Sequence, residues 1–316
     1  MIELLLAGAL FATAPQVPAS AASQDPVQLE DVIVSGRTLD SLITEFVGEV
    51  AEPNRRRGLA RWHDDVCVGV ANLDGAAAQY LTDRISTVAS DLGLSAGTPG
   101  CSPNILVIAT ADAEGLARQM AGQRSRAFRM GGSGMDRGGA ALRDFVDTDR
   151  PVRWWQMSLP VDSETGDIAV RIPGQCTGDC TSAMQMAPQI NVASASRLTT
   201  QIVDNLIRAI VIVDVDQVSD VSILQLADYI ALVTLAQIDP DADTSGFASI
   251  LNVFETPEIA DSLTEWDLAY LDGLYDAERT QVGERAGRSE IVDSIRRAHE
   301  RLRDREGEGE KPAPAN

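Results

Sequence analysis

Residues 66–110, VCVGVANLDGAAAQYLTDRISTVASDLGLSAGTPGCSPNILVIAT, decide the fold class of this chain. Residues 66–71 form an apolar run typical of a strand, and residues 104–110 form a second one. Between them, Asp74 suits the N-cap of a helix. Apolar side chains then recur at helical spacing at Ala78, Leu81, Ile85, Val88 and Leu92. A strand, a helix and a strand in this order predict parallel pairing in a sheet covered by helices.

Two further regions read as strands. Residues 152–159 place Trp154 and Trp155 on opposite faces, because successive strand side chains alternate. Residues 168–172 alternate again after a turn-like segment and suggest a hairpin, and residues 209–213 have the composition of a buried strand. We therefore expect an α/β (α+β) fold with a mixed, partly parallel sheet and helices on its faces.

The C-terminal part is expected to be helical. Residues 223–237 carry apolar side chains at spacings of three and four. A second helix follows Thr264, which with Asp267 fits a modified capping box. Residues 284–305 form a charged helix with one apolar side.

Composition divides the chain into five segments. Residues 1–21 read as a signal peptide, residues 22–60 as an N-terminal arm or linker, and residues 61–276 as the mixed α/β domain. Residues 277–306 contain the C-terminal helix, and residues 307–316 are polar, contain Pro and are expected to be disordered.

The N-terminus indicates export. Residues 2–14 are apolar over the length of a signal-peptide core, and Ala19-Ser20-Ala21 has the A-x-A form of a cleavage site. The positive N-terminal region is missing, since no Lys or Arg precedes Arg37; a start codon assigned too far downstream would explain this. The alternative is an uncleaved apolar helix packed in the fold. Cleavage predicts a periplasmic or secreted protein.

The charge balance narrows the partners. The formal net charge is -21 and aromatic residues make up 4% of the chain. Such a charge repels phosphate backbones and anionic lipid, and stacking platforms for bases are scarce. No second apolar stretch approaches the about 18 residues of a membrane span. We expect an envelope protein or a small ligand as the partner, with no nucleic acid and no membrane span in the mature chain.

Four cysteines agree with export, because disulfides persist in oxidising compartments. Three pairings are possible, of which Cys67 with Cys101 and Cys176 with Cys180 is the simplest. A four-thiolate zinc site is the alternative. It normally needs two closely spaced pairs of cysteines, and only Cys176 and Cys180 are close here.

The segments SILNVF (249–254) and LTEWDLAYLDGLYD (263–276), after a strand, a turn and a helix, carry a resemblance. Over residues 150–276 the chain resembles a family of secreted Gram-negative proteins of unknown function distantly related to zincin metallopeptidases. The resemblance implies a zincin-like domain.

A zincin binds zinc through H-E-x-x-H, in which two His one turn apart hold the metal and Glu activates water. The matching helix reads Gln225-Leu226-Ala227-Asp228-Tyr229, so both His and the Glu are replaced. The resemblance therefore implies either a pseudoenzyme or a repurposed binding scaffold, with no catalytic residue, metal or cofactor. Gln225, Asp228 and Tyr229 become candidates for a polar cleft, and the alternative is that they cap or pack the helix.

Asp239, Asp241 and Asp243 alternate as ligands do at the start of a calcium loop. The pattern then departs, because Thr244 stands where Gly is required and Ile250 where a bidentate Glu is required. An irregular calcium site is the remaining hypothesis.

Other chemical patterns are weaker. Asp214 and Asp216 lie on one face of a strand and are candidates for carboxylate acid/base chemistry, with strand-end solvation as the alternative. His63 lies beside two Asp, but no nucleophile is marked, and His299 is distant in sequence. Five arginines between positions 118 and 137 would suit an anionic partner or a solvated loop, namely Arg118, Arg124, Arg126, Arg129 and Arg137.

Three functional hypotheses follow. The first is an exported non-catalytic, zincin-like protein that binds a protein or ligand in the cell envelope. The second is a carboxylate-dependent hydrolase without zinc that uses Asp214, Asp216 and Asp228. The third is an accessory to TonB-linked uptake, because residues 31–37, DVIVSGR, resemble the N-terminal signature of TonB-dependent outer-membrane receptors. A short edge strand or a disordered arm is the alternative for this segment.

Export predicts that the mature protein starts near Ala22 and contains no free thiol. N-terminal sequencing and thiol alkylation without reduction, on protein recovered from a Gram-negative host, check both points. Intact Met1 together with four alkylatable cysteines would overturn the export hypothesis.

Overall fold

The computed structural model describes residues 37–54, 57–63, 65–129, 135–170, 172, 190 and 196–309. The chain divides into two units, residues 1–37 and 38–316. The description below concerns the second unit.

Four strands form one sheet in the order β1-β2-β4-β3. β1 (Val68–Ala71), β2 (Ile105–Thr110) and β4 (Ile202–Asp214) are parallel, and β3 (Val152–Asp162) pairs antiparallel with β4. The mixed, partly parallel sheet predicted from the sequence is therefore confirmed. β3 and β4 are longer than predicted. Of the hairpin expected after β3, the described residues show one bridge, between Val161 and Ile168.

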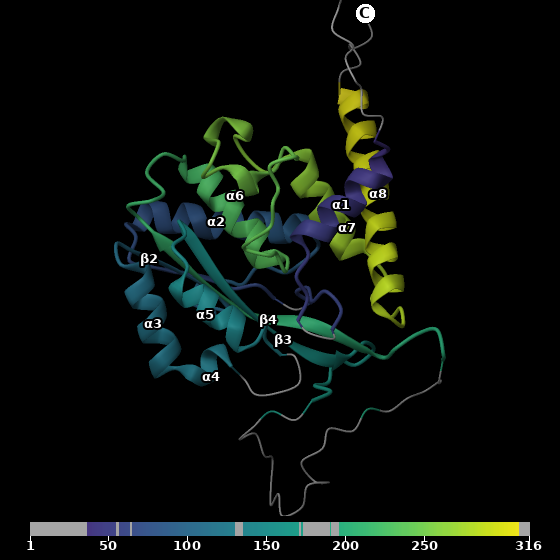
Figure 1. Ribbon diagram of the computed structural model, residues 1–316, viewed down its shortest axis with the longest axis horizontal. Helices are drawn as coiled ribbons and strands as arrows, with labels where there is room; N and C mark the ends of the chain where they lie inside the picture. Colours follow the sequence, from purple (N-terminus) through teal and green to yellow (C-terminus); the bar gives the residue numbers. More distant parts are fainter. Residues whose placement is uncertain are drawn as a thin grey trace, which may run out of the picture. The chain divides into compact units, whose positions relative to one another are not determined.

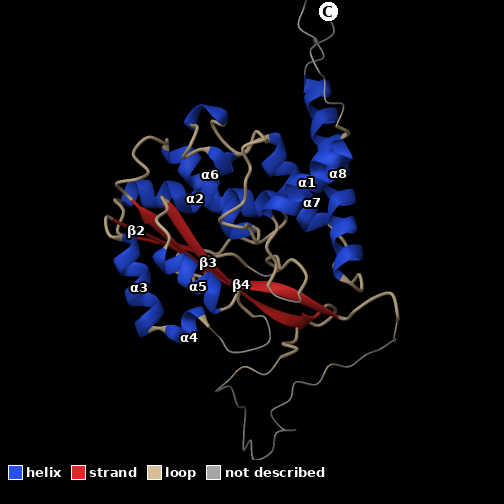
Figure 2. Cartoon of the chain, in the orientation of Figure 1, coloured by secondary structure: helices blue, strands red, loops and turns tan. Residues whose placement is uncertain are grey.

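Helices cover both faces of the sheet, as Figures 1 and 2 show. One layer contains α1 (Leu39–Val50), α2 (Gly75–Asp91), α6 (Ile223–Leu235), α7 (Glu265–Asp276) and α8 (Glu284–Gly309), with the short turns η1 (Ile250–Asn252) and η2 (Pro257–Ile259). The other layer contains α3 (Ala113–Gln123), α4 (Ser125–Phe128) and α5 (Gly139–Asp147). Trp154 joins the core of the first layer and Trp155 that of the second, so their predicted opposite orientation is confirmed.

The predicted helix starts are confirmed by their capping bonds. Asp74 accepts hydrogen bonds from the N–H groups of Ala76 and Ala77 at the start of α2. Thr264 and Asp267 form the capping box of α7. Such caps satisfy N–H groups that have no partner within the helix.

Helix α6 is buried on more sides than the apolar spacing of residues 223–237 indicates. All eleven residues from Gln225 to Leu235 are buried, because the helix lies between the sheet, α2 and α7. The helix is therefore part of the core.

The assignment of residues 22–60 to an arm is wrong over residues 39–50, which form α1. Ile43, Phe46, Val47 and Val50 are buried there, at the spacing of an amphipathic helix. The ring centroid of Phe46 lies 5.0–5.7 Å from those of three other aromatic residues, Phe247, Trp266 and Tyr270. α1 is thus a core element.

The C-terminal helix α8 packs on α7 and continues to Gly309, so residues 307–309 are helical where the sequence suggested a disordered tail. Residues 310–316 lie outside the described residues, as do residues 1–36, which contain the proposed signal peptide and almost all of the TonB-like segment. No helix in the described part of the chain is long and apolar enough to cross a bilayer.

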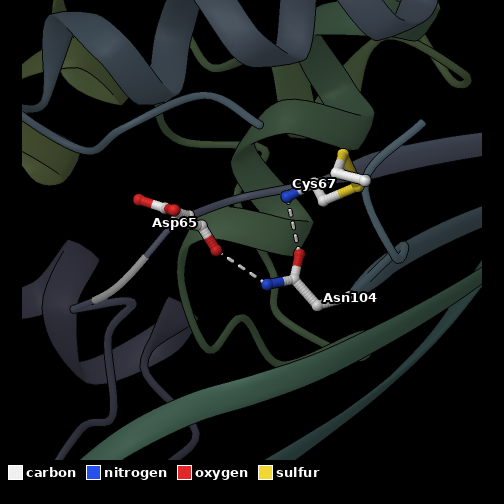
Figure 3. Close-up of a disulfide and its surroundings, with 4 residues drawn as sticks. Asp65, Cys67 and Asn104 are labelled. Atoms are coloured by element: carbon white, nitrogen blue, oxygen red, sulfur yellow. Dashed lines mark hydrogen bonds between the residues drawn. A yellow bond between two sulfur atoms is a disulfide. The ribbon is translucent and has the colours of Figure 1, made fainter. Parts of the chain in front are cut away.

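The disulfide between Cys67 and Cys101 is confirmed and joins the approaches to β1 and β2. Figure 3 shows Asn104 beside it: its Oδ1 accepts from the N–H of Cys67 at 2.8 Å, and its Nδ2 donates to the carbonyl of Asp65 at 2.8 Å. The covalent bond and the amide together fix the start of the parallel pair. Cys176 and Cys180 lie outside the described residues.

The contact between α7 and α8 depends on Gly273. A Cβ atom at this position would lie 2.5 Å from the Cα atom of Ile295 and 2.6 Å from its backbone nitrogen. Gly273→Ala must therefore move the helices apart, and we expect a loss of about 1–3 kcal/mol in the free energy of unfolding. The matched control is Gly48→Ala in α1, where no atom lies within 4 Å of the added Cβ. The control should be neutral or stabilising by up to about 1 kcal/mol. Chemical denaturation measures both variants, and equal stability would contradict the close-packing argument.

Candidate functional site

A cavity of about 590 Å³ opens between four segments that are distant in sequence. The segment after α1, the first residues of β4, the end of α7 and the start of α8 all line it. Its volume lies within the range of about 300–1,000 Å³ that is usual for small-molecule sites.

The lining of this cavity is positively charged in an acidic chain. It contains four arginines and two carboxylates, an excess of two positive charges, whereas the whole chain carries -21. The charged lining residues are Arg57, Arg61, Arg279, Arg288, Asp204 and Glu278. We call the four arginines the arginine group.

Arg61 connects the segment before β1 to the end of α7. Its Nη1 donates to the carbonyl oxygens of Leu274 at 2.6 Å and Ala277 at 3.1 Å, and its guanidinium lies 5.8 Å from the centre of the Tyr275 ring. Burial lowers the pKa of Arg61, so the charge is held at a cost in solvation.

Arg279 lies in the same charged environment. Its Nη2 donates to the backbone carbonyl of Asp204 and to Oδ1 of Asn205, the latter at 2.7 Å. Burial, followed by the repulsion of Arg61, lowers the pKa of Arg279 to about 10. Both guanidinium groups are thus partly desolvated, and each repels the other. An anion in the cavity would relieve both costs.

Asp204 is the buried carboxylate of the lining. Burial raises the pKa of Asp204, against the attraction of Arg57, whose Nε lies 3.9 Å from Oδ1 of the carboxylate. The Asp204 side chain is 7% exposed. Its carboxylate is therefore a mostly buried part of the cavity lining.

Helix α8 begins at the cavity and adds to its positive potential. Gly283, with a φ of +100°, and Gly287 both line it, and the N–H of Gly287 makes the first helical bond, to the carbonyl of Gly283. The positive end of a helix dipole lies at such an N-terminus. The helix end thus acts in the same sense as the arginine group.

The predicted cleft residues lie elsewhere and are fully engaged in packing. Nε2 of Gln225 donates to the carbonyls of Pro257 at 2.7 Å and Ala260 at 2.8 Å. Tyr229 is buried between Trp154 and Phe254, and burial raises the pKa of its phenol. Neither residue lines the 590 Å³ cavity.

Asp228 is completely buried and forms an ion pair with Arg84 of α2. Its two oxygens accept from Nε at 2.5 Å and Nη2 at 3.0 Å, and Oδ2 also accepts from the N–H of Leu263 at 2.9 Å. The carboxylate therefore joins α6 to α2 and to the segment before α7, and it does not line the 590 Å³ cavity.

The described candidates for metal binding are engaged in other interactions. An amide that donates to two carbonyls and a packed phenol do not fit zinc. Asp239 and Asp241 instead pair with Arg137 at 3.8 Å and Arg150 at 2.6 Å, and Asp243 accepts from Ser245. Within the described ranges, no group of three or more His, Cys, Asp or Glu side chains is placed to hold a metal ion.

The remaining catalytic candidates are dispersed. Asp214 accepts from the N–H of Asp216 at 3.1 Å, as in a turn after the strand, so the strand-end alternative describes this pair. His299 is buried beside Glu265, with Nδ1 3.2 Å from Oε1, and its ring packs against Trp266. Asp214, Asp216, His63 and His299 do not line the cavity.

The predicted arginine-rich loop does not supply the site. Arg118 pairs with Glu114 and Asp147, and Arg137 pairs with Glu52 and Asp239. Sequence reasoning missed the arginine group, although residues 54–61, NRRRGLAR, concentrate positive charge in an acidic chain and could have drawn attention to it.

Comparison with known proteins adds no relative. No family model, no curated protein and no solved structure matches the chain. The resemblance to secreted relatives of zincins stays untested.

The role of Asp228 can be measured against an exposed carboxylate. We expect Asp228→Ala to lower the free energy of unfolding by about 3–5 kcal/mol, because it leaves Arg84 without its buried partner. The matched control is Asp293→Ala in α8, where Asp293 is 56% exposed and pairs with Arg296 at 3.5 Å. The control should cost less than about 1 kcal/mol. Similar losses in both variants, by chemical denaturation, would contradict a structural role for Asp228.

Proposed function

We propose that this protein is an exported binding protein that holds a small anionic ligand in the cavity lined by the arginine group. The observation that carries the proposal is the convergence of four arginines from separate segments on one 590 Å³ cavity in a chain of net charge -21. Charge balance over the surface does not require such a concentration of one sign.

The chemistry of the arginine group favours a carboxylate or a phosphate. A guanidinium presents a planar fork of N–H donors that matches both groups. The hydrogen bonds of Arg61 and Arg279 to described residues each use one terminal nitrogen. Because burial lowers the pKa of both guanidinium groups and Arg61 repels Arg279, a bound anion would add a favourable interaction for each group.

Binding without catalysis fits the carboxylates of the site better than hydrolysis does. Glu278 accepts from the N–H and hydroxyl of Thr280 at 2.9 and 2.8 Å, which lowers its pKa and keeps it ionised. Asp204 lines the cavity, but its side chain is only 7% exposed and its Oδ1 is buried, so it is poorly placed to act on a ligand. Two carboxylates acting as acid and base must both reach the substrate. The carboxylate-dependent hydrolase is therefore the less favoured proposal.

Two features support placement outside the cytoplasm. The N-terminus has the form of a cleavable leader, and Cys67 and Cys101 form a disulfide at the start of the sheet. A protein that binds small anions in an envelope compartment accounts for both features and for the cavity.

Removal of one exposed arginine tests the proposal without disturbing the fold. Calorimetric titration of the purified protein with citrate and with inorganic phosphate should show binding that weakens as sodium chloride is raised. Arg288→Ala should weaken it roughly three- to tenfold, because a charge-assisted interaction is lost. The matched control, Arg285→Ala, lies three residues away on α8 and does not line the cavity. Equal affinities for the two variants would refute the proposed function.

A further inference from the structure

The mouth of the cavity carries exposed apolar side chains. Seven large hydrophobic residues are exposed in the described part of the chain, and three of them lie together here: Leu198 at 78%, Ile202 at 40% and Val282 at 49%. Ile202 and Val282 line the cavity, and the N–H of Val282 donates to the carbonyl of Leu198 at 3.1 Å. Exposed apolar surface gathered at one place marks a binding site more often than single exposed residues do.

The backbone holds this apolar mouth in place. Thr199 and Gln281 form an antiparallel bridge, and the N–H of Thr200 donates to the carbonyl of Thr280 at 2.7 Å. The segment before β4 and the segment before α8 are therefore paired where their apolar side chains are exposed.

The inner lining is apolar as well. Side chains from α1, β4, α7 and α8 contribute Val47, Val203, Leu274 and Ile291, and Leu59 adds to them. A fully hydrated inorganic anion would gain nothing from these walls, whereas an alkyl or aromatic body would be removed from water there.

A small molecule fits this surface better than a protein. The apolar residues line a concave cavity of about 590 Å³. A stable protein interface usually buries about 1,200–2,000 Å², far more than three side chains at a mouth supply.

We infer that the ligand is an amphiphilic anion, with one carboxylate or phosphate bound by the arginine group and an alkyl or aromatic body held by the apolar lining. This inference rests on the proposed function and specifies the chemical class of its ligand. The acidic head and the apolar body are recognised by different residues, so their contributions can be separated.

A chain-length series tests the apolar half. Calorimetric titration with acetate, hexanoate, octanoate and decanoate, each below its micelle concentration, should show affinity rising about two- to fourfold for each added methylene. Decyl phosphate should bind like decanoate, and decanol should bind more weakly because it lacks the charge.

Two variants locate the binding. Val282→Ser should weaken decanoate binding roughly three- to tenfold and leave citrate binding unchanged, since it removes apolar contact only. The matched control is Val215→Ser: Val215 is 38% exposed, follows β4 and does not line the cavity. Arg288→Ala should weaken both decanoate and citrate.

The outcomes distinguish the two proposals. If acetate and decanoate bind equally and Arg288→Ala weakens both, the amphiphile inference is overturned and the anion-binding proposal stands. If decanoate binding is insensitive to Val282→Ser, the inference is likewise overturned, because the alkyl chain then binds elsewhere. Absence of binding by every anion overturns both proposals.

Discussion

The carboxyl end of helix α6 is buried, and its backbone carbonyls must find donors from other parts of the chain. Buried carbonyls without partners are costly, and the last turn of a helix leaves four of them. Nε2 of Gln156 on β3 donates to the carbonyls of Val233 and Ala236 at 2.9 and 2.8 Å. The indole of Trp62 donates to Thr234 at 2.8 Å, and the hydroxyl of Tyr275 to Leu235 at 2.9 Å. One helix end thus fixes the sheet, the segment before β1 and the end of α7 relative to each other.

The cavity is a consequence of the same constraint. Arg61 precedes Trp62, and its guanidinium reaches the carbonyls at the end of α7 because Trp62 and Tyr275 are held at the end of α6. Arg279 follows Tyr275 by four residues and meets the first part of β4. The interactions that satisfy the helix therefore bring two positive charges together, where burial lowers the pKa of both and the repulsion of Arg61 lowers that of Arg279 further.

Local sequence patterns predicted the elements and missed the site for a physical reason. Alternation placed Trp154 and Trp155 correctly, and the capping residues Asp74 and Thr264 marked helix starts, because such signals depend on neighbouring residues alone. Gln225 and Asp228 suggested a cleft, yet their partners lie on other segments: the carbonyls of Pro257 and Ala260, and the guanidinium of Arg84. The convergence of the arginine group could not be predicted for the same reason, because only the tertiary fold brings its four members to one cavity.

Under the proposed function, the acidity of the chain and the positive cavity would together limit the size of the ligand. At physiological salt, electrostatic interactions between exposed charges decay over about 8 Å, so an anion small enough to enter the cavity experiences mainly the local excess of positive charge. A polyanion such as a nucleic acid extends beyond that distance and also meets the rest of the chain. Because the chain as a whole carries a net charge of -21, this wider contact is repulsive. The apolar lining adds a second requirement, because a compact hydrated anion leaves it exposed to water. Under the proposed function, the net charge would therefore disfavour large anions, and the cavity wall would discriminate among the small ones.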